Sequence, residues 1–265
     1  MKKNALVRAL AVSALFMATS VGAVPVIVNA SLSNIATAFD SIITGTGSTV
    51  VTAPVVNGVS TYNYIDNNGA AATVTVTRPN GTAVSPSGGY SDGGVSLSGS
   101  VWGISPSQSG ADPIPGFNSG LKFSFSSPVN AFGFEIGDWA TCCTGTTRNA
   151  SVVATYGVPT RGSGLWIAFD GGAATLPANA LSSADNPGRP QSYTNFIGAI
   201  DSSGFFSTVN FFGDGFGEFL VAGGSLRFAS VPRGSVGGQV PEPASLALLG
   251  IGLAGLAAMR RRKTA

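Results

Sequence analysis

Apolar and polar residues alternate along much of this 265-residue chain, most clearly from residue 121 onward. In residues 121–126, leucine and phenylalanine fall on one side of the chain, and lysine and serine on the other. A Ser-Pro-Val-Asn turn at 127–130 follows, and residues 132–136 then resume the alternation. A period of two on both sides of a turn predicts two half-buried antiparallel strands.

Similar short segments recur along the chain, separated by Asp-Gly and Gly-Gly pairs that are typical of β-turns. Between the two ends no long helical period is seen, although residues 33–42 have room for a short helix. The pattern predicts an all-β fold, an antiparallel β-sandwich of jelly-roll-like type, from about residue 31 to 232. Further predicted strands are 73–77, 95–101, 150–156, 165–169, 195–200, 208–212, 218–222 and 226–230.

Composition and charge limit the classes of protein to which this chain can belong. The chain has 37 glycines, 15 prolines and 10% charged residues, but its 16 phenylalanines are too many for a disordered linker. The formal net charge of +2 comes from basic residues at the two ends. The remainder holds seven basic and eleven acidic residues, a net charge of about −4, with no basic run. This excludes nucleic-acid binding that depends on a positively charged surface.

The N-terminus has the three parts of a secretory signal peptide. Basic residues come first, an apolar stretch at 9–18 follows, and small residues come next. We predict a signal peptide over residues 1–23 with cleavage after Ala23, or alternatively after Ala30. An uncleaved anchor helix is disfavoured because the apolar stretch is too short to span a bilayer.

The C-terminus predicts a membrane helix and a stop signal. Residues 244–259 contain no charged side chain, and as a helix they would extend about 24 Å, slightly less than a bilayer core. A basic cluster follows directly and fits a stop-transfer signal that stays in the cytoplasm. The body would then lie outside the inner membrane. The cluster consists of Arg260, Arg261, Arg262 and Lys263.

Pro241, Glu242 and Pro243, followed by this helix and the arginine cluster, resemble the PEP-CTERM sorting signal of exported Gram-negative bacterial proteins. The resemblance covers residues 240–265 and implies cleavage near the Pro-Glu-Pro triplet by the membrane protease exosortase. It also implies delivery to the cell surface or the extracellular polysaccharide. The same tail carries the label of an ice-binding protein C-terminal domain, which describes a tail and implies no ice binding.

Two body segments resemble a common PEP-CTERM passenger type. They are FSFSSPVNAFGFEIGD, which begins at Phe123, and NFIGAIDSSGFFSTVNF, which begins at Asn195. The resemblance brings no established activity. Residues 233–239 are expected to form a flexible linker between the sandwich and the membrane.

The chain contains no histidine, which excludes Ser-His-Asp and Cys-His catalysis and removes the usual zinc ligands. Glu135 and Glu218 are the body's glutamates and could act as a glycan-cleaving pair. By alternation Glu135 points away from the phenylalanine side, exposed or lining a groove. The alternative is a solvated charge on a strand face, and we expect the protein not to be an enzyme.

Aspartates gather in turn-like segments such as IDNNG, SDGG, FDGG and GDGFGE. They lack the spacing of an EF-hand, and Asp-Gly pairs are common in β-turns. We therefore predict turns and no cofactor, with one structural calcium ion as the alternative.

The tryptophans give two alternatives. Trp102 and Trp166 each fall opposite the aliphatic residues of their predicted strands. Exposed rings there could stack on sugars and make glycan contacts. Otherwise both strand faces are buried and the rings belong to the core.

Cys142 and Cys143 are adjacent and are the chain's two cysteines. Free thiols seldom persist after export to an oxidising compartment. A strained disulfide between them is the preferred expectation, and bridges to a second chain or reduced thiols are the alternatives.

Together these patterns predict an exported protein with a non-enzymatic structural or adhesive role in extracellular polysaccharide. The expected partners are signal peptidase, exosortase, the inner membrane and the polysaccharide. A carbohydrate-binding module is the alternative, and a glycan-cleaving enzyme is the third hypothesis.

Overall fold

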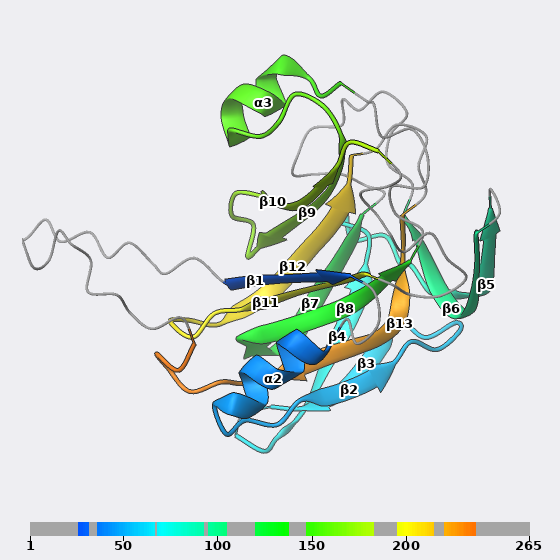
Figure 1. Cartoon of the computed structure of the whole chain (residues 1–265). Helices are drawn as coiled ribbons and strands as arrows, with labels where there is room; N and C mark the ends of the chain where they lie inside the picture. The colour runs from blue at the N-terminus through cyan, green and yellow to red at the C-terminus, as the bar shows by residue number, and fades with distance from the viewer. Residues whose placement is uncertain are drawn as a thin grey trace, which may run out of the picture.

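A computed structural model describes residues 26–31, 36–66, 68–92, 95–104, 120–137, 147–182, 195–214 and 220–236. These residues form two antiparallel sheets that pack face to face (Figure 1). The prediction of an all-β antiparallel fold is confirmed. The described strands outnumber the eight of a simple jelly roll, so the finer jelly-roll description is not established.

The seven-stranded sheet has the order β1-β11-β8-β13-β6-β5, and β2 also pairs with β13. The six-stranded sheet has the order β10-β9-β12-β7-β4-β3. In the first sheet the strands are β1 (Val26–Ser31), β11 (Asn195–Ile200), β8 (Ala131–Gly137), β13 (Leu220–Ala229), β6 (Val95–Ile104), β5 (Ser87–Asp92) and β2 (Val51–Pro54). In the second they are β10 (Thr175–Ala180), β9 (Ser163–Phe169), β12 (Phe206–Gly213), β7 (Leu121–Val129), β4 (Ala71–Thr77) and β3 (Thr61–Ile65).

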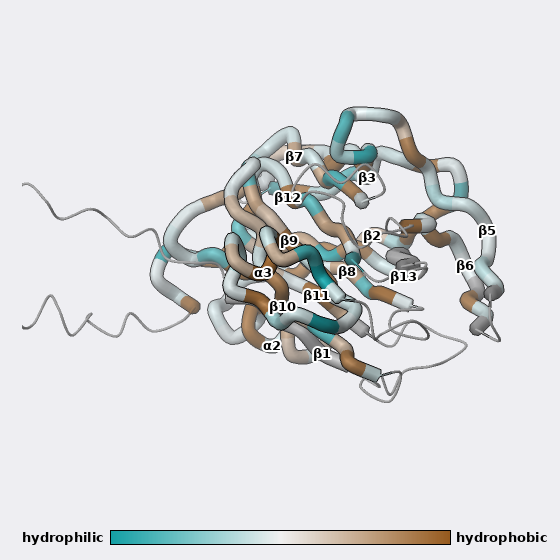
Figure 2. Tube along the Cα trace, turned by 90° about the horizontal axis from the view of Figure 1, so that it is seen from above, coloured by the Kyte–Doolittle hydropathy of each residue, from teal (hydrophilic) through white to brown (hydrophobic). Residues whose placement is uncertain are grey.

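The core between the sheets is built from alternating aromatic residues, as the sequence predicts. Phe123 of β7 lies 4.8 Å from Phe132 and 5.2 Å from Phe134 of β8, measured between ring centroids. Phe134 in turn meets Phe211 of β12 edge to face. Hydrophobic and hydrophilic residues are interspersed along the strands (Figure 2). β7 and β8 do not pair with each other, since the turn between them carries the chain from one sheet to the other.

One predicted strand is wrong. Residues 150–156 form the helix α3 (Ala150–Tyr156) although their valines and threonine favour strands. The Asn149 side chain caps the helix by accepting a hydrogen bond from the Ser151 backbone N–H. Gly157 ends the helix in the left-handed conformation, with φ of 63°. The two caps therefore outweigh the β propensity of the residues between them.

Two other predicted strands, 218–222 and 226–230, merge into the single strand β13. Its pairing with β8 shifts between Gly223 and Leu226, which marks a bulge. Gly224 occupies the bulge with φ of +67°, a conformation that glycine adopts at little cost. The Glu135 carboxylate accepts a hydrogen bond from the Ser225 N–H at 2.9 Å, so it satisfies a donor that the shifted ladder leaves free.

The predicted short helix is confirmed as α2 (Thr37–Gly45), which packs on the outer face of the seven-stranded sheet (Figure 1). Gly133 of β8 and Gly198 of β11 lie directly opposite each other under this helix. A methyl group on Gly198 would come within 2.6 Å of the Phe39 ring, and one on Gly133 would overlap the Phe196 ring. The two glycines therefore make room for the aromatic pair that holds α2.

β1 pairs with β11 over six residues at the edge of the sheet, ahead of the predicted domain boundary at residue 31. Among the described residues no helix is long and apolar enough to cross a membrane. The predicted helix at 244–259 lies outside those residues.

Replacing Phe134 with alanine should lower the free energy of unfolding by about 3–5 kcal/mol, because the ring is 1% exposed at the centre of the core. Urea or guanidinium denaturation measures this. Phe205→Ala is the matched control: the ring is 53% exposed, and its loss should cost less than about 0.5 kcal/mol. A Phe134→Ala cost below about 1 kcal/mol would contradict the core assignment.

The Gly198→Ala variant should lose about 1–3 kcal/mol through overpacking against Phe39. Gly103→Ala in β6 is the control, since a methyl group there meets no atom within 4 Å. Thermal melts of the two variants compare them directly. Equal stability of the two would mean that α2 does not rest on this glycine.

Candidate functional site

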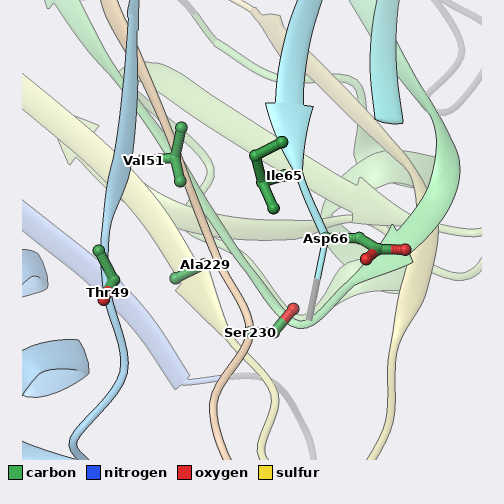
Figure 3. A pocket seen from close by; sticks show the side chains of 6 residues that line it. All are labelled: Thr49, Val51, Ile65, Asp66, Ala229 and Ser230. Atoms are coloured by element: carbon green, nitrogen blue, oxygen red, sulfur yellow. The ribbon is translucent and has the colours of Figure 1, made fainter. Parts of the chain in front are cut away.

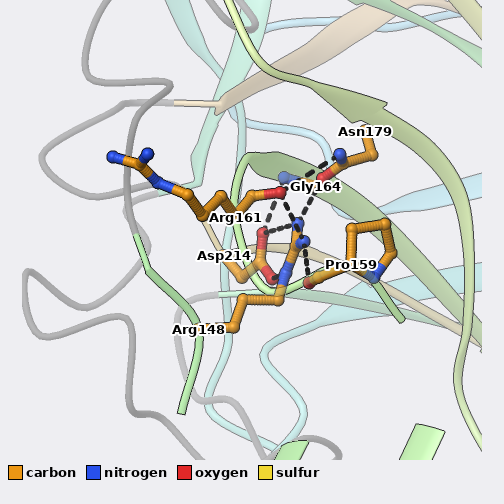
Figure 4. A network of polar contacts seen from close by, with 6 residues as sticks. All are labelled: Arg148, Pro159, Arg161, Gly164, Asn179 and Asp214. Carbon is orange, nitrogen blue, oxygen red and sulfur yellow. Dashed lines mark hydrogen bonds and ion pairs between the residues drawn. The ribbon is translucent and has the colours of Figure 1, made fainter. Parts of the chain in front are cut away.

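A buried polar network centres on Arg148, which precedes α3, and Asp214, which directly follows β12 (Figure 4). Their residues are 4% and 7% exposed. Arg148 Nε donates to Asp214 Oδ2 at 2.5 Å, and a terminal nitrogen donates to Oδ1 at 3.2 Å. The Gly164 N–H of β9 donates to the same Oδ1 at 2.6 Å. The pair is therefore bidentate, the geometry in which arginine and carboxylate interact most strongly.

The remaining donors of Arg148 are also used. One terminal nitrogen donates to the backbone carbonyls of Pro159 and Arg161, at 2.9 and 3.2 Å. The other also donates to Asn179 Oδ1 of β10 at 2.5 Å. All five N–H donors of the guanidinium thus have an acceptor. The network ties the two ends of the α3 segment to β9, β10 and β12, and leaves no donor of Arg148 for a ligand.

Sequence reasoning missed this network. The sequence predicts an ordinary turn at Asp214, and Arg148 lies in no recognisable motif. The two residues are 66 positions apart, so no local pattern links them. The one available signal was the scarcity of arginine in a body with seven basic residues.

The surroundings of the Glu135 side chain differ from those that the sequence predicts. Its side chain is 18% exposed and is engaged rather than free or lining a groove. Besides the bulge of β13 it contacts Arg227, whose Nη1 lies 3.4 Å from Oε1. Arg227 also lies 3.3 Å from the Asp40 carboxylate of α2. Glu135 thus links β8, β13 and, through Arg227, α2. Its proposed catalytic partner Glu218 lies outside the described residues.

Both tryptophans are buried, which corrects the hypothesis that they are exposed platforms for glycan contacts. Trp102 is 1% exposed in the core between the sheets, edge-on to Tyr62 and Phe123. Trp166 is 0% exposed on the outer face of the six-stranded sheet. There Tyr156 of α3 meets it edge to face. The alternation correctly places each tryptophan ring on the opposite side of its strand from the aliphatic neighbours. It does not predict what covers that side of the strand.

A cavity of about 280 Å³ lies between the end of β3 and the end of β13 (Figure 3). It is lined by Thr49, Val51, Ile65, Asp66, Ala229 and Ser230. Hydrogen bonds from the Ala70 backbone, the Ser127 hydroxyl and the Asn68 backbone lower the pKa of Asp66. Its carboxylate is thus committed to closing a turn, as the sequence predicts for the IDNNG segment.

Several other predicted site residues lie outside the described residues, and their expected roles stay predictions. They are Ala23, Cys142, Cys143, Pro241, Glu242, Pro243 and the cluster Arg260, Arg261, Arg262 and Lys263. Within the described part of the chain, no group of three or more acidic, cysteine or histidine side chains could hold a metal ion.

Comparison with protein families finds the PEP-CTERM protein-sorting motif at residues 239–263. The match bears out the predicted sorting signal and indicates an exported protein that is processed at the membrane by exosortase. It spans the tail and leaves the sandwich unassigned. Comparisons with curated proteins and with solved structures gave no match.

Replacing Arg148 with methionine should cost about 3–5 kcal/mol of stability, because Asp214 would keep a buried charge without its partner. Chemical denaturation measures the loss. Asp214→Leu combined with Arg148→Met is the control, and the double variant should lose less than the sum of the two single losses. Additive losses would mean that the pair acts as two independent residues.

Proposed function

We propose that this protein is exported, held for a time in the inner membrane by its tail, and cut by exosortase at Pro241, Glu242 and Pro243. The sandwich then reaches the cell surface or the extracellular polysaccharide, where it has a non-enzymatic structural or adhesive role. The sorting motif at residues 239–263 is the observation that carries the proposal. The two prolines keep the cleavage site extended and accessible to a protease.

The way in which charged groups are used supports a structural role for the sandwich. Asp214 and Glu135, both buried or half-buried, hold backbone N–H groups and arginines in place. Asp66 and Asp170 accept hydrogen bonds from backbone N–H groups at strand ends. These carboxylates stabilise turns, a bulge and strand ends.

The position of β1 supports signal peptide cleavage after Ala23 rather than after Ala30. Cleavage after Ala23 would leave the whole of β1 on the mature chain. Cleavage after Ala30 would remove all but Ser31 of this strand and expose the edge of β11. The loss of this six-residue pairing favours the earlier site.

A carbohydrate-binding module remains the second candidate function. It is favoured by one surface, the outer side of the six-stranded sheet over β3, β4, β7 and the start of β12, where most of the outward side chains are polar and at least partly exposed.

Intact mass spectrometry of the protein recovered from the host's surface and medium tests the sorting proposal. We expect a chain that starts at Val24 and ends near Pro241-Glu242-Pro243. Replacing Glu242 with alanine should leave the uncut precursor in the membrane. Ser235→Ala, in the turn after β13, is the control and should be processed normally. A recovered mass that still includes Arg260 to Ala265 would contradict release.

A further inference from the structure

The outer surface of the six-stranded sheet is divided into two halves. Over β9 and the end of β12, the outward residues Trp166, Ala168 and Phe212 form an apolar cluster with Val152 of α3. Over β3, β4, β7 and the start of β12, most outward residues are polar and at least partly exposed, and the exposed apolar exceptions are Ile65, Ala71 and Pro128. The described helices α2 and α3 pack elsewhere, on the other sheet and on the apolar half (Figure 1).

Strand register arranges this polar half into rows. Thr61, Thr75, Ser124 and Thr208 pair in sequence across four strands. Thr77, Lys122 and Asn210 form the next row, and Asn63 pairs with Thr73 in a third. Because adjacent strands are about 4.8 Å apart, the rows bring hydroxyl and amide groups side by side, with the Lys122 ammonium among them. We call these nine residues the hydroxyl face.

Charge on the hydroxyl face is sparse and positive. Lys122 is the single lysine between residues 4 and 262 of the sequence. Its ammonium makes no ion pair or hydrogen bond to another described residue, although other residues of the chain bring an excess of acidic groups. Arg78 follows Thr77, the residue that pairs with Lys122, and its guanidinium donates to the backbone carbonyls of Gly103 and Gly120.

Among the described residues, two carboxylates lie towards the other end of β7, and both are already bound. Asp66 accepts hydrogen bonds from the backbone of Asn68 and Ala70. Asp170 accepts them from the N–H groups of Ser207 and Thr208. The hydroxyl face thus presents hydroxyls, amides and an ammonium that has no ion-pair partner among the described residues.

We propose that the hydroxyl face binds an acidic polysaccharide, with sugar hydroxyls hydrogen-bonded to the threonine, serine and asparagine rows and a sugar carboxylate paired with Lys122. The inference rests on the proposed function, because export brings the sandwich to extracellular polysaccharide. Charge complementarity selects the occupant: a hydroxyl-rich chain matches the rows, and a carboxylate matches the ammonium.

Binding of the processed full protein to immobilised polygalacturonate, a uronic acid polymer, tests the inference, with neutral dextran as the comparison polymer. We expect binding to polygalacturonate that weakens as salt rises. Lys122→Gln should weaken it about fivefold, the effect of losing one exposed charge pair. Lys122→Arg should restore binding, and Arg233→Gln, which removes an exposed charge in the turn after β13, should leave it unchanged.

A second variant tests the rows separately from the charge. Thr75→Val with Ser124→Ala removes two neighbouring hydroxyls from partly exposed positions and should weaken binding without changing its salt dependence. No binding to polygalacturonate, equal binding to dextran, or unchanged affinity in Lys122→Gln would each overturn the inference. None of these results would alter the masses that test sorting, so the two proposals can fail independently.

Discussion

The contact between β7 and β8 across the sandwich is the interaction on which the rest of the structure depends. Phe123 and Phe125 of one sheet interlock with Phe132 of the other at ring-centroid distances of 4.8–5.1 Å. Tyr64 and Phe228 extend the same cluster to β3 and β13. With 10% charged residues the chain has few ionic contacts to offer, so burial of these rings is the main source of its stability.

Three smaller structural features organise the outer faces, and each depends on glycine residues or on a buried charge. The opposed glycines of β8 and β11 let α2 approach the sheet, and Gly224 lets β13 form a bulge that Glu135 fills. The Arg148 network anchors α3 over Trp166.

Alternation along the chain was sufficient to predict most strands and the residues that share a side. It could not predict which side faces the core: Leu97 and Val101 lie outside while Trp102 lies between the sheets. Residues 150–156 were misassigned because Asn149 and Gly157 act on the ends of the segment and not on its composition. The Arg148–Asp214 pair could not be predicted for another reason, because only tertiary folding brings the two residues together.

Lys122 also has a consequence for the chemistry of the mature chain. With residues 1–23 and the tail beyond the Pro-Glu-Pro triplet removed as proposed, the chain would keep two primary amines, its N-terminus and the Lys122 side chain. Acylating reagents and aldehydes at the reducing ends of sugars react with such groups. Covalent attachment through the lysine would therefore hold every molecule in the same orientation, with the six-stranded sheet towards the support.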